Sequence, residues 1–201
     1  MGTKFVIVTI KGTSALLMHA YPMADPPKGW EKWGPEEQAK ISEYRDPDTG
    51  MCYIPGVNIR QSLVQAATYS KGKGRASLQK PVAACVLVTP ERCSLGVGTY
   101  GIDSRPVVIA ATRGRIMRHR PRFDDWQTTF TIEYDPALIS QNELRQVVDD
   151  AGSRCGLLDF RPEKKGPFGR FMVTSWQGLA VCAGHGEAWL GLAGQGEARQ
   201  G

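Results

Sequence analysis

Short runs of hydrophobic residues separated by glycine, proline and charged residues give the first indication of strands. Residues 4–11 are rich in β-branched side chains and lie between two glycines, a composition typical of a strand. Residues 126–134 alternate more strictly and have Trp126, Phe130 and Tyr134 on one side, as expected for a strand with one buried face. Similar runs predict further strands at residues 82–89, 106–111 and 170–176.

Apolar residues recur at helical spacing in residues 58–68. Ile59, Leu63 and Ala66 fall on one face of such a helix. Asn58 stands where its side chain can accept a hydrogen bond from the first turn. We therefore expect an amphipathic helix that begins at Asn58 and packs against the predicted sheet.

A second helix is expected at residues 141–151. Its start carries Ser140 followed three residues later by Glu143, which is the pattern of a capping box. An apolar stripe follows, and Gly152 is a natural stop. A shorter helix is expected at residues 35–40, inside a connection that is otherwise rich in proline and glycine.

The predicted order is strand, helix, two or three strands, helix and strand. This is the β-α-β-β-α-β order of an α+β, ferredoxin-like or RRM-like domain. We expect one such domain over residues 1–177, with large insertions at about residues 18–50 and 90–125. Residues 178–201 are rich in glycine and alanine without sustained apolar periodicity, which predicts a low-complexity tail.

Motifs for metal ions, nucleotides and membranes are missing from the 201-residue sequence. The five cysteines include no CxxC pair, the three histidines are far apart, and no P-loop occurs. No GxGxxG lies between a predicted strand and a predicted helix, because Gly96-Val97-Gly98 precedes no helix. We therefore expect no metal and no cofactor. No apolar run reaches the roughly 20 residues of a membrane span, and no signal-peptide pattern is present. These features predict a cytoplasmic protein that does not bind membranes.

Charge adds a possible partner. The chain has 25 basic and 20 acidic residues, a net charge of +5, and five of the arginines fall within residues 113–122. Arg118, Arg120 and Arg122 are spaced by two, so in an extended segment they project on one side. The planar guanidinium group suits phosphates, and the adjacent Phe123 could stack on a base. We expect these side chains to be exposed and to contact nucleic acid; the less favoured alternative is that they pair with nearby aspartates.

Two further basic groups support a nucleic-acid partner. One follows the first predicted helix and the other lies in the glycine-containing loop after the second, where Gly166 and Gly169 could let backbone amides approach a phosphate. The predicted nucleic-acid contacts are Arg60, Lys71, Lys73, Arg75, Arg113, Arg115, Arg118, Arg120, Arg122, Phe123, Arg161, Lys164, Lys165 and Arg170.

Evidence for catalysis is thin. His19 could act as a general acid or base in RNA cleavage, but it stands among apolar residues, where a histidine is more often structural. The cysteines and Ser14 have no evident base nearby in the sequence. We assign no catalytic residue and keep His19 as the one weak candidate.

Two segments resemble the RAMP superfamily, the RNA-binding proteins of CRISPR effector complexes. Residues 48–63 (DTGMCYIPGVNIRQSL) are similar to that family's entry to its first helix, and residues 156–171 (GLLDFRPEKKGPFGRF) resemble its glycine-rich loop. The resemblance covers roughly residues 3–176 and is nearest to the backbone subunits that line up along a guide RNA. It implies a modified RRM or ferredoxin-like palm with an inserted thumb, for which residues 113–122 are a plausible position, and a role in antiviral defence. The short chain and its tail depart from the family, which leaves open a stand-alone homologue encoded by a mobile element.

Together these features predict a non-catalytic subunit that assembles side by side along single-stranded RNA, with itself and with other effector subunits. One alternative is a metal-independent endoribonuclease of the same superfamily that uses His19. Another is a single-stranded DNA-binding protein of a mobile element, because the same basic surface would serve both nucleic acids.

Overall fold

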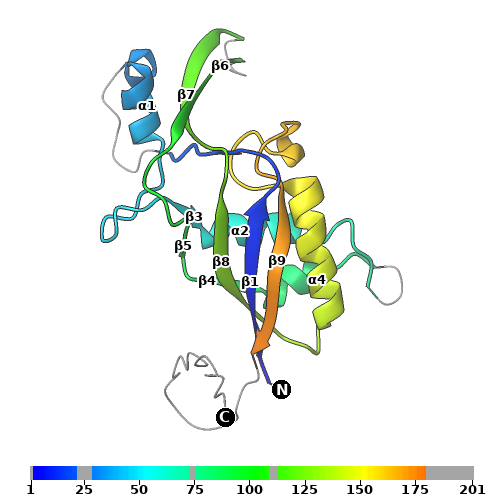
Figure 1. Ribbon diagram of the computed structural model, residues 1–201. Helices are drawn as coiled ribbons and strands as arrows, with labels where there is room; N and C mark the ends of the chain where they lie inside the picture. The colour runs from blue at the N-terminus through cyan, green and yellow to red at the C-terminus, as the bar shows by residue number, and fades with distance from the viewer. Residues whose placement is uncertain (1, 22–28, 73–75, 109–112, 180–201) are drawn as a thin grey trace, which may run out of the picture.

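The computed structural model describes residues 2–21, 29–72, 76–108 and 113–179. Its central element is an antiparallel sheet of four strands in the order β4-β8-β1-β9. The strands are β1 (Lys4–Gly12), β4 (Leu87–Thr89), β8 (Gln127–Tyr134) and β9 (Phe171–Leu179). The protein therefore has mixed α+β structure with antiparallel sheets (Figure 1).

The strands predicted from alternation are confirmed. β1 lies inside the sheet, where Val8 is opposite Phe130 of β8 and Trp176 of β9. The first and last predicted strands are thus neighbours, as expected. Side chains on one face of β1 and β8 are buried and those on the other face are not, because successive residues of a strand point to opposite faces.

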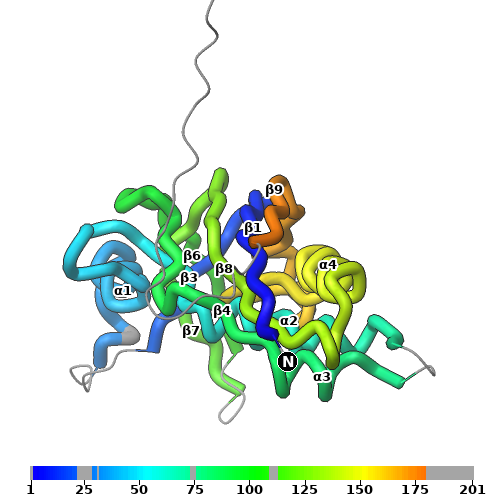
Figure 2. Tube along the Cα trace, turned by 90° about the horizontal axis from the view of Figure 1, so that it is seen from below, coloured from blue at the N-terminus to red at the C-terminus, as the bar shows by residue number. Residues whose placement is uncertain are grey.

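Helices α2 (Gly56–Ala66) and α4 (Gln141–Asp150) contact each other and cover the same face of the sheet (Figures 1 and 2). Both were predicted. The capping box of α4 is formed: the Ser140 N–H donates to Glu143 Oε2 at 2.9 Å, and the Glu143 N–H donates to the Ser140 hydroxyl at 3.3 Å. Apolar residues of both helices join one core cluster with the inner face of the sheet, including Ile59, Leu63 and Val147.

Three local predictions are wrong. Residues 82–89 are not one strand: α3 (Gln79–Cys85) comes first, and only β4 is extended. A short apolar run fits a helix or a strand equally well, and here only Val82 of α3 is buried. Asn58 does not cap α2, which begins two residues earlier after Pro55.

The third wrong prediction concerns Gly152, which does not end the second helix. The chain continues in a wider helical turn, η3 (Ala151–Cys155), and turns away at Gly156, whose φ is 70°. Gly152 is instead buried against Phe171, where a Cβ atom would collide with the backbone of β9. The glycine is needed for close packing of helix against strand, not for a turn.

The insertions form two smaller sheets and a short helix. β2 (Leu16–Leu17), β7 (Arg115–Phe123) and β6 (Gly101–Val108) make one sheet, and β3 (Tyr53–Pro55) pairs with β5 (Arg92–Ser94). The β6–β7 hairpin extends beyond the end of the central sheet, with α1 (Pro35–Ile41) against β7 (Figure 1). The short helices η1 (Trp30–Lys32) and η4 (Pro162–Lys164) complete the connections.

No helix in the described part of the chain is long and apolar enough to cross a membrane. The strand predicted at residues 106–111 falls within β6 up to Val108, and its remaining residues lie outside the described ones. Most of the predicted tail also lies outside them, although its first two residues, Gly178 and Leu179, belong to β9.

Candidate nucleic-acid interface

Arg118, Arg120 and Arg122 of β7 project on one side, as their spacing predicts, whereas Arg115 projects on the other. Arg118 and Arg120 are opposite Arg105 and Asp103 of β6. Because residues directly opposite in an antiparallel pair lie on the same face, these four charged side chains share one face of the hairpin. That face carries both signs of charge, so it is not a purely basic stripe.

The prediction that all three central arginines are exposed is wrong. Arg120 keeps only 8% of its surface accessible, and its Nε lies 2.8 Å from Asp159 Oδ2. This contact is a close ion pair, although its geometry gives neither atom a directed hydrogen bond. Arg122 is half-buried and lies 2.7 Å from Asp124 and 3.8 Å from Asp103. Arg120 therefore holds the hairpin to the loop that contains Asp159.

The guanidinium groups of Arg118 and Arg105 each pack against an aromatic ring. The Arg118 guanidinium lies 5.2 Å from the centre of the Trp30 ring, and that of Arg105 lies 4.6 Å from the Phe168 ring. Arg105 also donates from Nε to both oxygens of Asp103, at 2.7 and 2.9 Å. Cation–π contacts of this kind stabilise the arrangement and link the hairpin to η1 on one side and to the glycine-containing loop on the other.

Phe123 does not stack on a base. It is 3% exposed, and Trp126, which follows it, is 2% exposed. Phe123 pairs with Leu16 of β2 and its ring lies 5.8 Å from that of Tyr100. The prediction for Phe123 is wrong because its side chain alternates to the face opposite Arg120 and Arg122 and enters the core.

Several other predicted contacts have a structural role. Arg60 donates to the carbonyl oxygens of Ala83 and Val86, at 2.6 and 2.8 Å, which satisfies backbone groups at the end of α3. Arg161 donates to the Leu158 carbonyl at 2.7 Å and to Glu163 at 2.9 Å. Lys164 lies 3.7 Å from Glu163. These side chains are engaged before any ligand arrives.

The remaining predicted residues fall into two groups. Lys73 and Arg75 lie outside the described residues, and Lys71 beside them is exposed. Four other cations are exposed and have no acidic partner within the described residues: Arg113, Arg115, Lys165 and Arg170. These four, like Lys71, are free to bind an anion.

The loop of residues 156–169 has an unusual backbone. Leu158, Phe160 and Lys165 have φ values of 57°, 47° and 62°, in the left-handed region that side chains other than glycine rarely occupy. Strain of this kind tends to occur at functional sites. Gly166 and Gly169 pack against the backbone of Phe160 and Leu157, so their close approach is to the loop itself rather than to a phosphate. Two of these residues, Leu158 and Phe160, lie on either side of Asp159 and hold it in place.

A hollow of about 160 Å³ lies beside this loop. Its walls are His19, Tyr44, Asn58, Leu158, Asp159 and Arg161. The segment after β2, the segment after α1, the start of α2 and the loop thus bring together residues from four distant parts of the chain. Asn58, inside the first turn of α2, is a hydrogen-bond partner of Tyr44 here.

Burial sets the protonation of this hollow. It lowers the pKa of His19 below its usual value, and Arg120 and Arg118 act in the same direction against Asp159. His19 Nδ1 has no hydrogen-bond partner within the described residues. Burial also raises the pKa of Tyr44, opposed by its hydrogen bond to Asn58. At neutral pH the hollow therefore contains a neutral imidazole and a neutral phenol, which can donate and accept hydrogen bonds.

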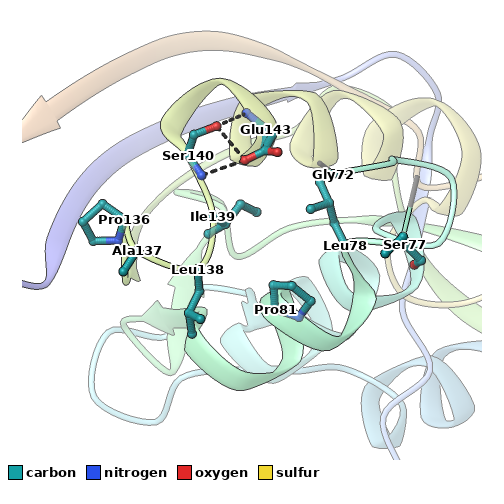
Figure 3. Close-up of a pocket in the computed structure, with 11 residues that line it drawn as sticks. Gly72, Ser77, Leu78, Pro81, Pro136, Ala137, Leu138, Ile139, Ser140 and Glu143 are labelled. Atoms are coloured by element: carbon teal, nitrogen blue, oxygen red, sulfur yellow. Dashed lines mark hydrogen bonds between the residues drawn. The ribbon is translucent and has the colours of Figure 1, made fainter. Parts of the chain in front are cut away.

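A larger hollow, of about 320 Å³, lies between α3 and the turn before α4 (Figure 3). Leu78, Pro81 and Leu138 supply apolar surface to its lining. Its polar side chains Ser140 and Glu143 are bonded to each other in the capping box. We assign no function to it, because size alone does not identify a site and the hydrogen bonds of Ser140 and Glu143 belong to the capping box.

The four described cysteines that are free, Cys52, Cys85, Cys93 and Cys155, do not form a site. Burial raises the pKa of Cys93 to about 12 and that of Cys155 to about 11, so both stay protonated and unreactive at neutral pH. Within the part of the chain that the structure describes, no three potential ligands gather in a way that could hold a metal ion.

Sequence reasoning missed Tyr44, Asp159, Trp30 and Arg105. Asp159 stands in the loop that resembles the RAMP family, which was a signal that it lies near the site. No local pattern marks the other three, because their roles depend on contacts between distant segments.

No protein-family model matches this chain, and no curated protein is significantly similar to it in sequence.

Proposed function

We propose that this protein binds single-stranded RNA across the β6–β7 hairpin and the loop of residues 156–169. One observation carries the proposal: two basic segments far apart in sequence meet, through the Arg120–Asp159 ion pair and the contact of Arg105 with Phe168. Arg115 is three residues along β7 from Arg118, roughly 10 Å, and Arg170 is two residues from Phe168. Arg115 projects from the opposite face of β7 to Arg118, because it is an odd number of residues away. Arg113 and Arg115 therefore extend the basic surface along the hairpin, and Arg170 extends it along the loop.

We further propose that the scaffold is a ferredoxin-like palm and the hairpin its thumb, as the resemblance to the RAMP superfamily implies. The order β1, α2, β4, β8, α4, β9 along the chain supports this, because it is the β-α-β-β-α-β succession. The β6–β7 hairpin lies within the insertion of residues 90–125. Membership of a CRISPR-type effector complex is part of the same proposal.

Binding by this surface is chiefly electrostatic. Guanidinium and ammonium groups release counterions when they neutralise phosphates, so the affinity falls as salt rises. Replacing Arg113, Arg115, Lys165 and Arg170 together by Gln should lower the salt slope by up to about 3, at roughly 0.7 per phosphate contact in a single strand. The fold should persist, because all four side chains are exposed.

The matched control is Lys4→Gln. Lys4 is also exposed but begins β1 at the end of the sheet away from the hairpin (Figure 1). Fluorescence anisotropy with a labelled RNA should show weaker, less salt-dependent binding for the fourfold variant and unchanged binding for the control. An unaltered affinity and slope in the fourfold variant would remove these residues from the interface.

Assembly along the RNA follows from the small size of the surface. One palm covers few nucleotides, and affinity rises when neighbouring copies extend the groove. A head-to-tail contact that repeats without closing gives an open array. Native mass measurements should find more copies per RNA as the RNA is doubled and doubled again in length. One copy on every RNA would contradict assembly while leaving binding intact.

A second function is favoured by one observation, the grouping of His19 with Tyr44 and Asp159 around one hollow. A neutral imidazole can take a proton from a 2′-hydroxyl, as metal-independent RNA cleavage requires. RNA incubated with the protein in the presence of a chelator should then be cut by the wild type and not by His19→Ala. Intact RNA with both would leave the non-catalytic binder as the function.

A further inference from the structure

The hollow around His19 offers hydrogen bonds without net positive charge. Asp159 is paired with Arg120 and Arg161 with Glu163, so the four charges nearest the hollow cancel. A phosphate entering it would meet the Asp159 carboxylate and gain no free cation. The phosphate-binding groups lie outside, among the exposed cations. The hollow is therefore suited to a neutral polar group.

Its volume limits what can enter. About 160 Å³ corresponds to the space of roughly five water molecules, which is too small for a whole nucleotide. The edge of a sugar ring that carries a hydroxyl fits this space. The occupant is then one polar group of a strand whose backbone stays on the arginine-bearing surface.

Donors and acceptors around the hollow match a hydroxyl group. His19 Nδ1 has no partner within the described residues, and the second carboxylate oxygen of Asp159, Oδ1, can accept a hydrogen bond. A hydroxyl donates one hydrogen bond and accepts others, so it can satisfy the carboxylate and the imidazole together. The ribose 2′-hydroxyl is such a group, and it is the group that distinguishes RNA from DNA.

We propose that this hollow receives a ribose 2′-hydroxyl of the bound strand and so makes the protein prefer RNA to DNA of the same sequence. The inference rests on the proposed function, because the strand must first lie on the surface formed by the hairpin and the loop. The strained residues Leu158 and Phe160 then have a role, since they hold Asp159 in position before the RNA arrives.

The experiment compares short strands of one sequence in RNA, DNA and 2′-O-methyl form, each long enough for one copy of the protein. The wild type should bind RNA roughly tenfold more tightly than either modified strand, the value of one good hydrogen-bonded group. His19→Phe keeps an aromatic ring of similar size but removes its hydrogen bonds. It should bind RNA only as tightly as DNA, with the RNA checked to be intact.

The control is His119→Phe. His119 is bonded to Ser104 at 2.7 Å on the face of the hairpin opposite Arg118 and Arg120, so the preference for RNA should be kept. Equal binding of RNA and DNA by the wild type would overturn the inference and leave nucleic-acid binding standing. A preference that survives His19→Phe, or that follows base identity, would also overturn it. Binding of neither strand would instead contradict the proposed function.

Discussion

The inner face of the central sheet and the arginine-bearing face of the β6–β7 hairpin are both built from alternating residues, but different forces hold them. In the sheet, Val6, Val8 and Ile10 are buried together with Phe130 and Ile132, and burial of apolar surface supplies the stability. In the hairpin, the same alternation brings together arginines and an aspartate that are joined by ion pairs and aromatic contacts. The sheet is thus a scaffold, and the hairpin is a polar element held in place by a few directed contacts.

The largest expected effect lies in the sheet. Phe130→Ala removes a ring that is 2% exposed and should lower the free energy of unfolding by about 3–5 kcal/mol. Denaturant titration measures this. Phe5→Ala on the opposite face of β1, where the side chain is only half-buried, should cost less than half as much. Equal costs would mean that both faces of the sheet are covered, and the contrast with the hairpin would lose its basis.

Arg120→Ala should be the next most damaging change. It leaves Asp159 without its counter-charge, and breaking a buried pair typically costs 3–5 kcal/mol. Asp159 is 32% exposed, so water offsets part of this and we expect about 2 kcal/mol. The double change Arg120→Met with Asp159→Leu should recover most of the loss, because no charge is then left unpaired. A double variant as unstable as Arg120→Ala would show that packing, not charge, holds the hairpin.

These two regions also differ in how far the sequence predicts them. Burial of Val6, Val8 and Ile10 depends on a period of two that is present in the chain itself, so β1 and its neighbours were predictable. The capping box at Ser140 is equally local. The helix at residues 79–85 was not predictable, because a short apolar run that buries only Val82 does not distinguish a helix from a strand.

The candidate site was predicted only in outline. Arg118 and Arg120 have the same residue type and lie two positions apart, yet one stacks on Trp30 and the other is buried against Asp159. Both partners come from other parts of the chain, so only the fold reveals them. Phe123 misled for the same reason, because its pairing with Leu16 of β2 decides its burial.

The pH dependence of stability sharpens the picture of the hollow. Because the pKa of His19 is lowered in the folded protein, the unfolded chain binds a proton there that the folded chain does not. Stability should therefore fall as the pH drops through the usual histidine pKa of about 6.5 and stop falling below the folded pKa. Thermal unfolding between about pH 5.5 and 7.5 measures this, and His19→Phe should remove that part of the slope. An unaltered slope in the variant would mean that the imidazole titrates as it does in water.

The smallest effect is expected at Arg122, two residues from Arg120 on the same strand. Its nearest acid, Asp124, lies 2.7 Å away but is 73% exposed, and Arg122 itself is 37% exposed. Exposed ion pairs contribute little because water screens them, so Arg122→Ala should cost less than about 1 kcal/mol. The small cost should shrink further in high salt, whereas the cost of Arg120→Ala should change little, because burial shields its pair from ions. Unfolding titrations of the two variants at low and high salt measure the difference. If Arg122→Ala proved as costly and as insensitive to salt as Arg120→Ala, the whole arginine row would be structural, and only Arg113 and Arg115 of this segment would remain free to bind a strand.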